Sequence, residues 1–77
     1  MHIVFYTKLG CSLCDDAERM MELVREDYPL SWTSVNILED DVAHEKYMFM
    51  IPVIEMNNEV LLSGNIGYVD IVELFVK

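Results

Sequence analysis

The chain has 77 residues, 53% of them hydrophobic, and a formal net charge of −9, so it forms one domain, which we expect to span residues 1–77. The negative charge repels nucleic-acid phosphates and anionic lipid surfaces, which excludes both as expected partners. With two cysteines, no leader-like start and no run of roughly 20 apolar residues, the pattern is not that of a secreted disulfide scaffold or a membrane protein, and we expect a cytoplasmic location.

The first half of the chain predicts a strand, a helix and a second strand. Residues His2–Thr7 are rich in β-branched and aromatic side chains and almost continuously apolar, which is typical of a central strand covered on both faces. Apolar residues then recur at helical spacing over Leu13–Tyr28, and Pro29 ends the helix. Residues Ser31–Leu38 predict a second strand, parallel to the first because the connection between them is a helix.

The second half predicts a short helix, a hairpin and a closing helix. Acidic residues begin the short helix, which extends to about Tyr47. Residues 52–56 and 59–63 predict two antiparallel strands joined by a tight Asn57–Asn58 turn, and residues 68–77 predict a helix. The expected fold class is therefore α/β, in the order β-α-β-α-β-β-α, with a four-stranded mixed sheet flanked by helices. Four methionines are expected in the core: Met20, Met21, Met48 and Met50.

The two cysteines, Cys11 and Cys14, lie three positions apart at the start of the predicted first helix. This spacing places both sulfurs on nearly the same helix face, where a disulfide can form but closes too small a ring to add much stability. Unpaired N–H groups at the first turn favour the thiolate of Cys11 and lower the pKa of its thiol, whereas Cys14 is one turn further in. The pattern predicts a redox pair in which Cys11 attacks and Cys14 resolves.

Three other positions are candidates for contact with a substrate. Lys8 lies three residues before Cys11, and its ammonium group would face the sulfur, a substrate carboxylate or solvent. Tyr6 ends the first strand, where it would either approach the thiols or pack in the sheet. Pro52 opens the third strand, where a proline is tolerated, and bonds preceding proline are the common sites of cis geometry.

The segments VFYTKLGCSLC, KYMFMIPVIEM and LLSGNIGYVDIVEL resemble, in order and spacing, those of small bacterial-type glutaredoxin-like proteins of the thioredoxin superfamily. The resemblance covers essentially the whole chain and implies a thioredoxin-like fold and a dithiol–disulfide oxidoreductase. It implies that Cys11 is the nucleophile, Cys14 the resolving thiol and Pro52 a cis-proline facing the sulfurs. Ile51 would offer its backbone to a substrate peptide or to glutathione. No metal and no tightly bound cofactor is implied.

The chain departs from the glutaredoxin pattern at two places. It has Cys-Ser-Leu-Cys where the family usually has Cys-Pro-Tyr-Cys. It also has Ser63-Gly64-Asn65, with no acid until Asp70, where the family has two glycines and an aspartate pair that holds glutathione. We therefore expect a monomer that takes a disulfide-containing protein or small molecule as substrate and either glutathione or a flavoprotein reductase as electron donor.

Two other classes of function stay open. A Cys-x-x-Cys pair is half of a zinc site, so a metal or cluster would need further ligands from His2, His44 or a second chain. The acidic composition would also suit a non-catalytic interaction module with a thioredoxin fold. A third interpretation, in which both cysteines are inert core residues, conflicts with the helix start after Gly10, which exposes Cys11.

Overall fold

The structure is a computed structural model that describes residues 1–76. Its elements follow the predicted order β-α-β-α-β-β-α, with one short 3-10 turn, η1, before the second helix. Within the described residues, no helix combines the length and the apolar character that crossing a bilayer requires. The bounds are β1 His2–Thr7, α1 Ser12–Arg25, β2 Ser31–Asn36, η1 Ile37–Glu39, α2 Asp41–Tyr47, β3 Val53–Met56, β4 Glu59–Ser63 and α3 Tyr68–Val72.

The four strands form one mixed sheet in the order β2-β1-β3-β4. Strand β1 pairs in parallel with β2 along its whole length, and β3 runs antiparallel to both β1 and β4. Asn57 and Asn58 form the turn of the hairpin with φ values of 54° and 64°, which Asn tolerates better than most residues and which a tight two-residue turn requires. The predicted mixed sheet and its antiparallel hairpin are therefore confirmed.

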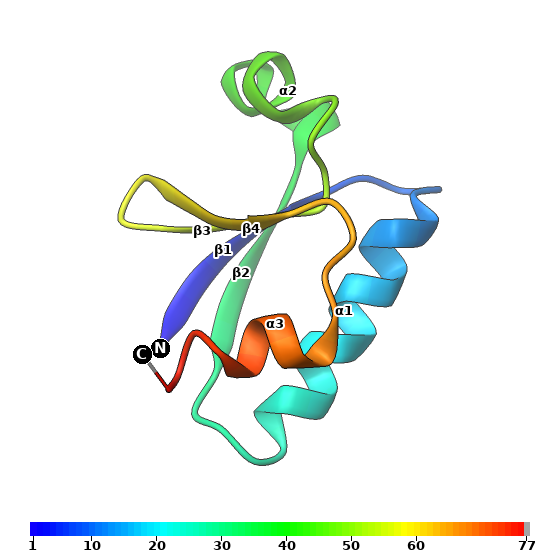
Figure 1. Ribbon diagram of the computed structural model, residues 1–77. Coiled ribbons are helices and arrows are strands. Elements are labelled where there is room, and N and C mark those ends of the chain that lie inside the picture. Colours follow the sequence, from blue (N-terminus) through cyan, green and yellow to red (C-terminus); the bar gives the residue numbers. More distant parts are fainter. Residues whose placement is uncertain (77) are drawn as a thin grey trace.

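Helices α1 and α3 lie together on one face of the sheet (Figure 1). The apolar face of α1 is turned toward the strands, and its burial contributes to the hydrophobic driving force for folding. Cys14 belongs to the core that results, so the second cysteine is fixed by the packing of the whole domain. The buried members of this core are Ile3, Phe5, Cys14, Ala17, Met21, Val24, Leu30, Ile54, Ile66 and Ile71.

The opposite face of the sheet is covered less completely. Among the described elements only α2 lies against it, and this helix has seven residues, two of them buried. As a result Ile3 and Phe5 of β1 are fully buried, whereas Val4 and Tyr6, which point to the other face, are half-buried. The expectation that β1 is covered on both faces holds in full for one face only.

Several predicted boundaries were wrong by a few residues. Helix α1 ends at Arg25, because Tyr28 precedes a proline and is disfavoured in helical geometry. Strand β2 ends at Asn36, whose side-chain oxygen accepts the N–H of Leu38 at 2.9 Å and so begins η1 instead of continuing the strand. Helix α3 ends at Val72, and the last residue of the predicted closing helix, residue 77, lies outside the described residues.

Candidate functional site

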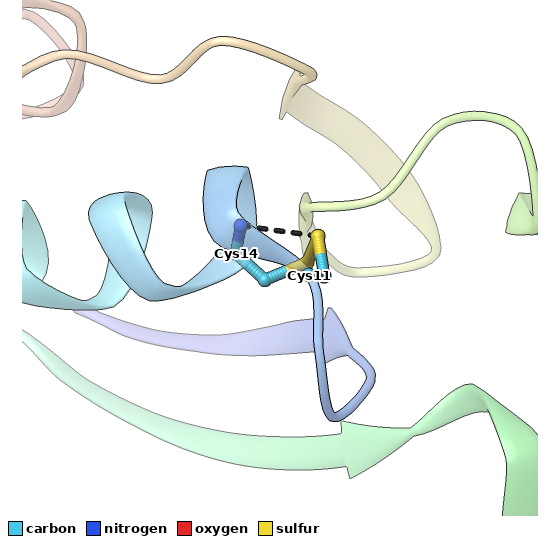
Figure 2. Close-up of a disulfide and its surroundings, with 2 residues drawn as sticks. All are labelled: Cys11 and Cys14. Carbon is cyan, nitrogen blue, oxygen red and sulfur yellow. Dashed lines mark hydrogen bonds between the residues drawn. A yellow bond between two sulfur atoms is a disulfide. The ribbon is translucent and has the colours of Figure 1, made fainter.

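Cys11 and Cys14 form a disulfide at the first turn of α1, with 5.2 Å between their Cα atoms (Figure 2). Cys11 is the N-cap of the helix, and its Sγ accepts the backbone N–H of Cys14 at 3.2 Å. The sulfur thus occupies the position at which a serine or aspartate oxygen usually accepts a hydrogen bond from the helix start. Gly10, with a φ of +79°, allows the sharp approach of the chain to this position. A helix N-terminus stabilises negative charge, so the position suits a thiolate at Cys11.

The two sulfur-bearing residues differ in exposure. Cys14 is 1% exposed and is part of the buried core, whereas Cys11 is half-buried and packs against the edge of that core. A molecule that approaches this end of α1 therefore reaches Cys11 first. Cys14 remains within bonding distance of its partner without being open to solvent.

The segment 48–52 joins α2 to β3, brings Ile51 to the same core and buries Pro52. Ile51 is half-buried and packs against the core cluster, as Cys11 does, and Pro52 is fully buried. The Ile51–Pro52 peptide bond is cis. The N–H of Ile51 donates to the carbonyl of Tyr47 at 3.1 Å, so the backbone group that Ile51 could offer to a peptide is its carbonyl. The carbonyl of Pro52 already accepts the N–H of Gly64 at 2.9 Å.

Lys8 and Tyr6 have different surroundings. Lys8 is exposed in the loop between β1 and α1, on the same segment as Cys11. Tyr6 instead packs its ring against Tyr47 of α2, with 4.8 Å between ring centroids, and its hydroxyl donates to Glu55 at 3.3 Å. Of the two alternatives for Tyr6, these contacts correspond to packing in the sheet.

Large apolar side chains are exposed on segment 8–13, which carries Cys11, and on segment 48–52, whose Ile51 packs against the same core as Cys11. Leu9 and Phe49 are the most exposed, at 87% and 91%. The prediction that Met48 and Met50 lie in the core was wrong, because α2 ends at Tyr47 and the chain turns outward before it enters β3. Leu13, which the helical spacing predicts on the buried face of α1, is 44% exposed, so this prediction was also wrong. The exposed apolar side chains of segments 8–13 and 48–52 are Leu9, Leu13, Met48, Phe49 and Met50.

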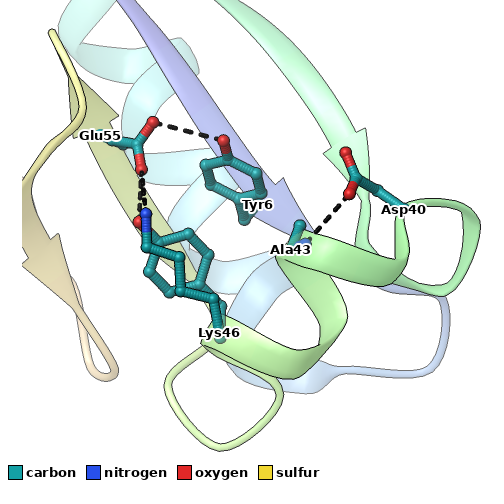
Figure 3. Close-up of polar contacts among 6 residues, drawn as sticks. Tyr6, Asp40, Ala43, Lys46 and Glu55 are labelled. Carbon is teal, nitrogen blue, oxygen red and sulfur yellow. Dashed lines mark hydrogen bonds and ion pairs between the residues drawn. The ribbon is translucent and has the colours of Figure 1, made fainter.

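The sequence patterns did not predict a buried polar cluster that Tyr6, Lys46, Tyr47 and Glu55 form. Glu55 of β3 is 6% exposed and accepts hydrogen bonds from the hydroxyls of Tyr6 and Tyr47, while Lys46 Nζ lies 3.9 Å from its Oε2 (Figure 3). Burial and the hydrogen bond to Glu55 raise the pKa of Tyr47 to about 12, and burial followed by the charge of Glu55 raises the pKa of Tyr6. The feature of the sequence that could have revealed this cluster is Glu55 itself, a single carboxylate within an otherwise apolar strand.

The histidines that could have joined the cysteines in a metal site lie elsewhere. The ring of His2 shares hydrogen bonds with the hydroxyls of Ser31 and Thr33 at 2.7 and 2.9 Å, and His44 lies on α2. Across residues 1–76, no three side chains of the metal-binding types His, Cys, Asp and Glu converge as a site would require. The cysteine pair therefore lacks further ligands from the described part of its own chain.

Residues 2–75 match the family model described as Glutaredoxin-like domain (DUF836). The chain belongs to this glutaredoxin-like family. The match includes both cysteines and the segment that contains Pro52, so the site lies within the region that defines the family.

Solved structures share the architecture of this glutaredoxin-like protein. The X-ray structure of structural genomics target protein XcR50 from X. campestris has a TM-score of 0.78 and 21% identity over 97% of each chain. Thioredoxin 1 from the thermophilic eubacterium Thermosipho africanus has a TM-score of 0.66 and 13% identity over 99% of this chain and 94% of its own. A structure described as a malarial protein has a TM-score of 0.69 and 13% identity over 97% and 92%. At these identities the likeness shows the fold alone, and the fold is that of thioredoxin.

Proposed function

We propose that this protein is a dithiol–disulfide oxidoreductase that reduces protein disulfides through Cys11 and Cys14. The observation that carries the proposal is the asymmetry of the pair: Cys11 is a half-buried N-cap and Cys14 is buried one turn later. A nucleophile needs access and a stabilised anion, whereas a resolving thiol needs only to lie close to the first sulfur. Membership of the glutaredoxin-like family and the thioredoxin fold support the same class of chemistry.

The proposed reaction transfers two electrons in two exchange steps. The Cys11 thiolate attacks one sulfur of the substrate disulfide, so that a mixed disulfide forms and the other substrate sulfur leaves as a thiolate. Cys14 then loses its proton and attacks Cys11 Sγ, which breaks the mixed disulfide and releases the second substrate thiolate. The substrate disulfide is reduced to two thiols, and the enzyme is left with the Cys11–Cys14 disulfide, which a thiol donor must reduce.

The exposed apolar side chains on segments 8–13 and 48–52 support a protein as substrate, because a partner surface would cover them. The electron donor is proposed to be a flavoprotein reductase in preference to glutathione. Asp70 is the first acidic residue after Gly64, in the region where glutaredoxins hold glutathione with aspartates. Its side chain instead accepts the N–H of Gly67 at 2.8 Å and caps the start of α3. The formal net charge of −9 also disfavours an anionic tripeptide.

The test compares three proteins: wild type, Cys11→Ser and Cys14→Ser. Reduction of insulin disulfides is measured with NADPH, supplied through either thioredoxin reductase or glutathione with glutathione reductase. We expect Cys11→Ser to abolish activity with both donors, because the remaining thiol, that of Cys14, is buried and cannot attack a substrate first. We expect Cys14→Ser to accumulate a mixed disulfide with substrate, visible as a mass increase that dithiothreitol removes.

Each result has a distinct meaning. Full activity of Cys11→Ser would refute the assignment of the nucleophile. Activity with the glutathione system alone would overturn the choice of donor while leaving the chemistry intact. A wild-type protein that reduces no disulfide with either donor, and traps none as Cys14→Ser, would favour the non-catalytic interaction module.

A further inference from the structure

Glu55 is buried on the side of the sheet away from α1. Its neighbour in β3, Ile54, belongs to the core beneath α1, and successive residues of a strand point to opposite faces. A buried carboxylate needs hydrogen-bond donors, and Glu55 obtains them from Tyr6 of β1 and Tyr47 of α2. The Tyr47 hydroxyl therefore joins the end of α2 to the middle of β3.

Helix α2 depends on that contact for its place on the sheet. A helix of seven residues is too short to be stable by itself, so tertiary contacts must hold it. Its buried residues are Ala43 and Tyr47, and of these Tyr47 has the larger side chain. The neighbouring Lys46 is a weaker anchor, because its side chain is exposed and its ammonium lies 3.9 Å from Glu55.

Tyr47 also holds segment 48–52 through its main chain. The carbonyl of Tyr47 accepts the N–H of Met50 at 2.8 Å and of Ile51 at 3.1 Å. The far end of this segment is held by Gly64, whose N–H is 3.2 Å from the Met50 carbonyl and 2.9 Å from that of Pro52. Burial fixes the Ile51–Pro52 end of the segment, whereas side chains 48–50 are exposed, so these hydrogen bonds hold the rest of it in place.

We propose that the Tyr47–Glu55 hydrogen bond positions segment 48–52 against Cys11, and that it thereby sets how well a protein substrate docks without altering the thiols themselves. This inference rests on the proposed oxidoreductase function. Tyr47 and Glu55 are positioning residues, since they act through the segment that Tyr47 holds. Cys11 and Cys14 are instead held by α1 and by the core on the other face of the sheet from Glu55.

The test uses Tyr47→Phe, which removes the hydroxyl and keeps the ring. The matched control is Tyr28→Phe, the same chemical change in a tyrosine that packs against Phe75 at the far end of α1, with 5.1 Å between ring centroids. For insulin reduction, we expect Tyr47→Phe to raise KM about 3- to 10-fold with kcat nearly unchanged. The alkylation rate of Cys11 by iodoacetamide and the reduction potential of the pair should equal those of wild type.

A second readout does not require turnover. In Tyr47→Phe, we expect hydrogen exchange of the Met50 and Ile51 amides to become about tenfold faster relative to amides of β1, and to be unchanged in Tyr28→Phe. Glu55→Gln keeps an acceptor oxygen for Tyr47, whereas Glu55→Leu does not. The KM and the amide exchange rates of Glu55→Gln should therefore lie closer to the wild-type values than those of Glu55→Leu.

Three results would overturn the inference. They are an unchanged KM with unchanged local exchange in Tyr47→Phe, a loss of kcat that parallels slower alkylation of Cys11, and equal effects of the Tyr28→Phe control. If wild type reduces no disulfide, the proposed function fails, but the exchange of Met50 and Ile51 still decides whether Tyr47 positions the segment.

Discussion

Reduction of the Cys11–Cys14 disulfide should lower the free energy of unfolding of the domain by only about 1–2 kcal/mol. The two cysteines are separated by three positions, so the bond closes a ring of four residues. In the chain-entropy model, such a ring stabilises the folded state by about 2 kcal/mol at 25 °C. Reduction frees a Cys11 thiolate at the N-cap of α1, where interaction with the helix start returns about 0.3–1 kcal/mol. The oxidised form should therefore be more stable by about 1–2 kcal/mol.

Thermal unfolding followed by circular dichroism checks this difference, with the oxidised protein compared with protein in excess phosphine reductant. For a domain of this length, each 1 kcal/mol shifts Tm by about 4–8 °C, so the two forms should differ by about 4–16 °C. The double variant Cys11→Ser with Cys14→Ser is the control and should not respond to the reductant. An oxidised form more stable by over about 4 kcal/mol would refute the reasoning, because the bond would then be a structural staple.

Three further predictions concern the fold that supports the site. Met21 is fully buried, whereas Met20 is half-buried. Met21→Ala should therefore lower the free energy of unfolding, measured in guanidinium, by about 2–5 kcal/mol, and Met20→Ala should lower it by clearly less. Equal losses in the two variants would contradict the packing of α1. The folded pKa of Tyr47 is raised to about 12 from 10.0, so its stabilising contribution is complete below pH 10 and is lost as pH rises through 12. The denaturation midpoint should accordingly fall between about pH 9 and pH 11.5, and fall less in Tyr47→Phe; a parallel fall in both proteins would exclude Tyr47 as the cause. Gly64 has a φ of +78° with open space around the position of a Cβ, so Gly64→Ala should cost about 1 kcal/mol from backbone conformation alone, and Gly64→Asn less; a cost of several kcal/mol would indicate a clash that the structure lacks.

Parts of the site were accessible from the sequence because they depend on neighbours along the chain. Cys-x-x-Cys after a glycine places two sulfurs on one turn of a helix, and the structure has them bonded there. The order of strands and helices also followed from local periodicity. Burial of the methionines followed from the sequence only in part. Met21 is in the core as expected, whereas Met48 and Met50 are exposed because α2 ends at Tyr47 and the chain turns outward after it.

The Glu55 cluster illustrates what local patterns cannot contain. Tyr47 and Glu55 are 8 residues apart, and Tyr6 and Glu55 are 49 apart. A carboxylate in an apolar strand signals a buried partner, but it does not say which of four tyrosines supplies the hydroxyl. That pairing depends on the placement of α2 over one face of the sheet.

By itself, then, the amino-acid order determined the elements, their parallel and antiparallel pairing, and a dithiol at the start of α1. Each of these follows from the spacing of apolar residues or from the backbone preferences of glycine, asparagine and proline, which act within one or two turns of the chain. Only the tertiary structure decided which core residues enclose Cys14, and that Tyr47 donates its hydroxyl hydrogen bond to Glu55. The physical reason is that exposure and long-range hydrogen bonding are set by which element covers which face, and that arrangement exists only once the chain has folded.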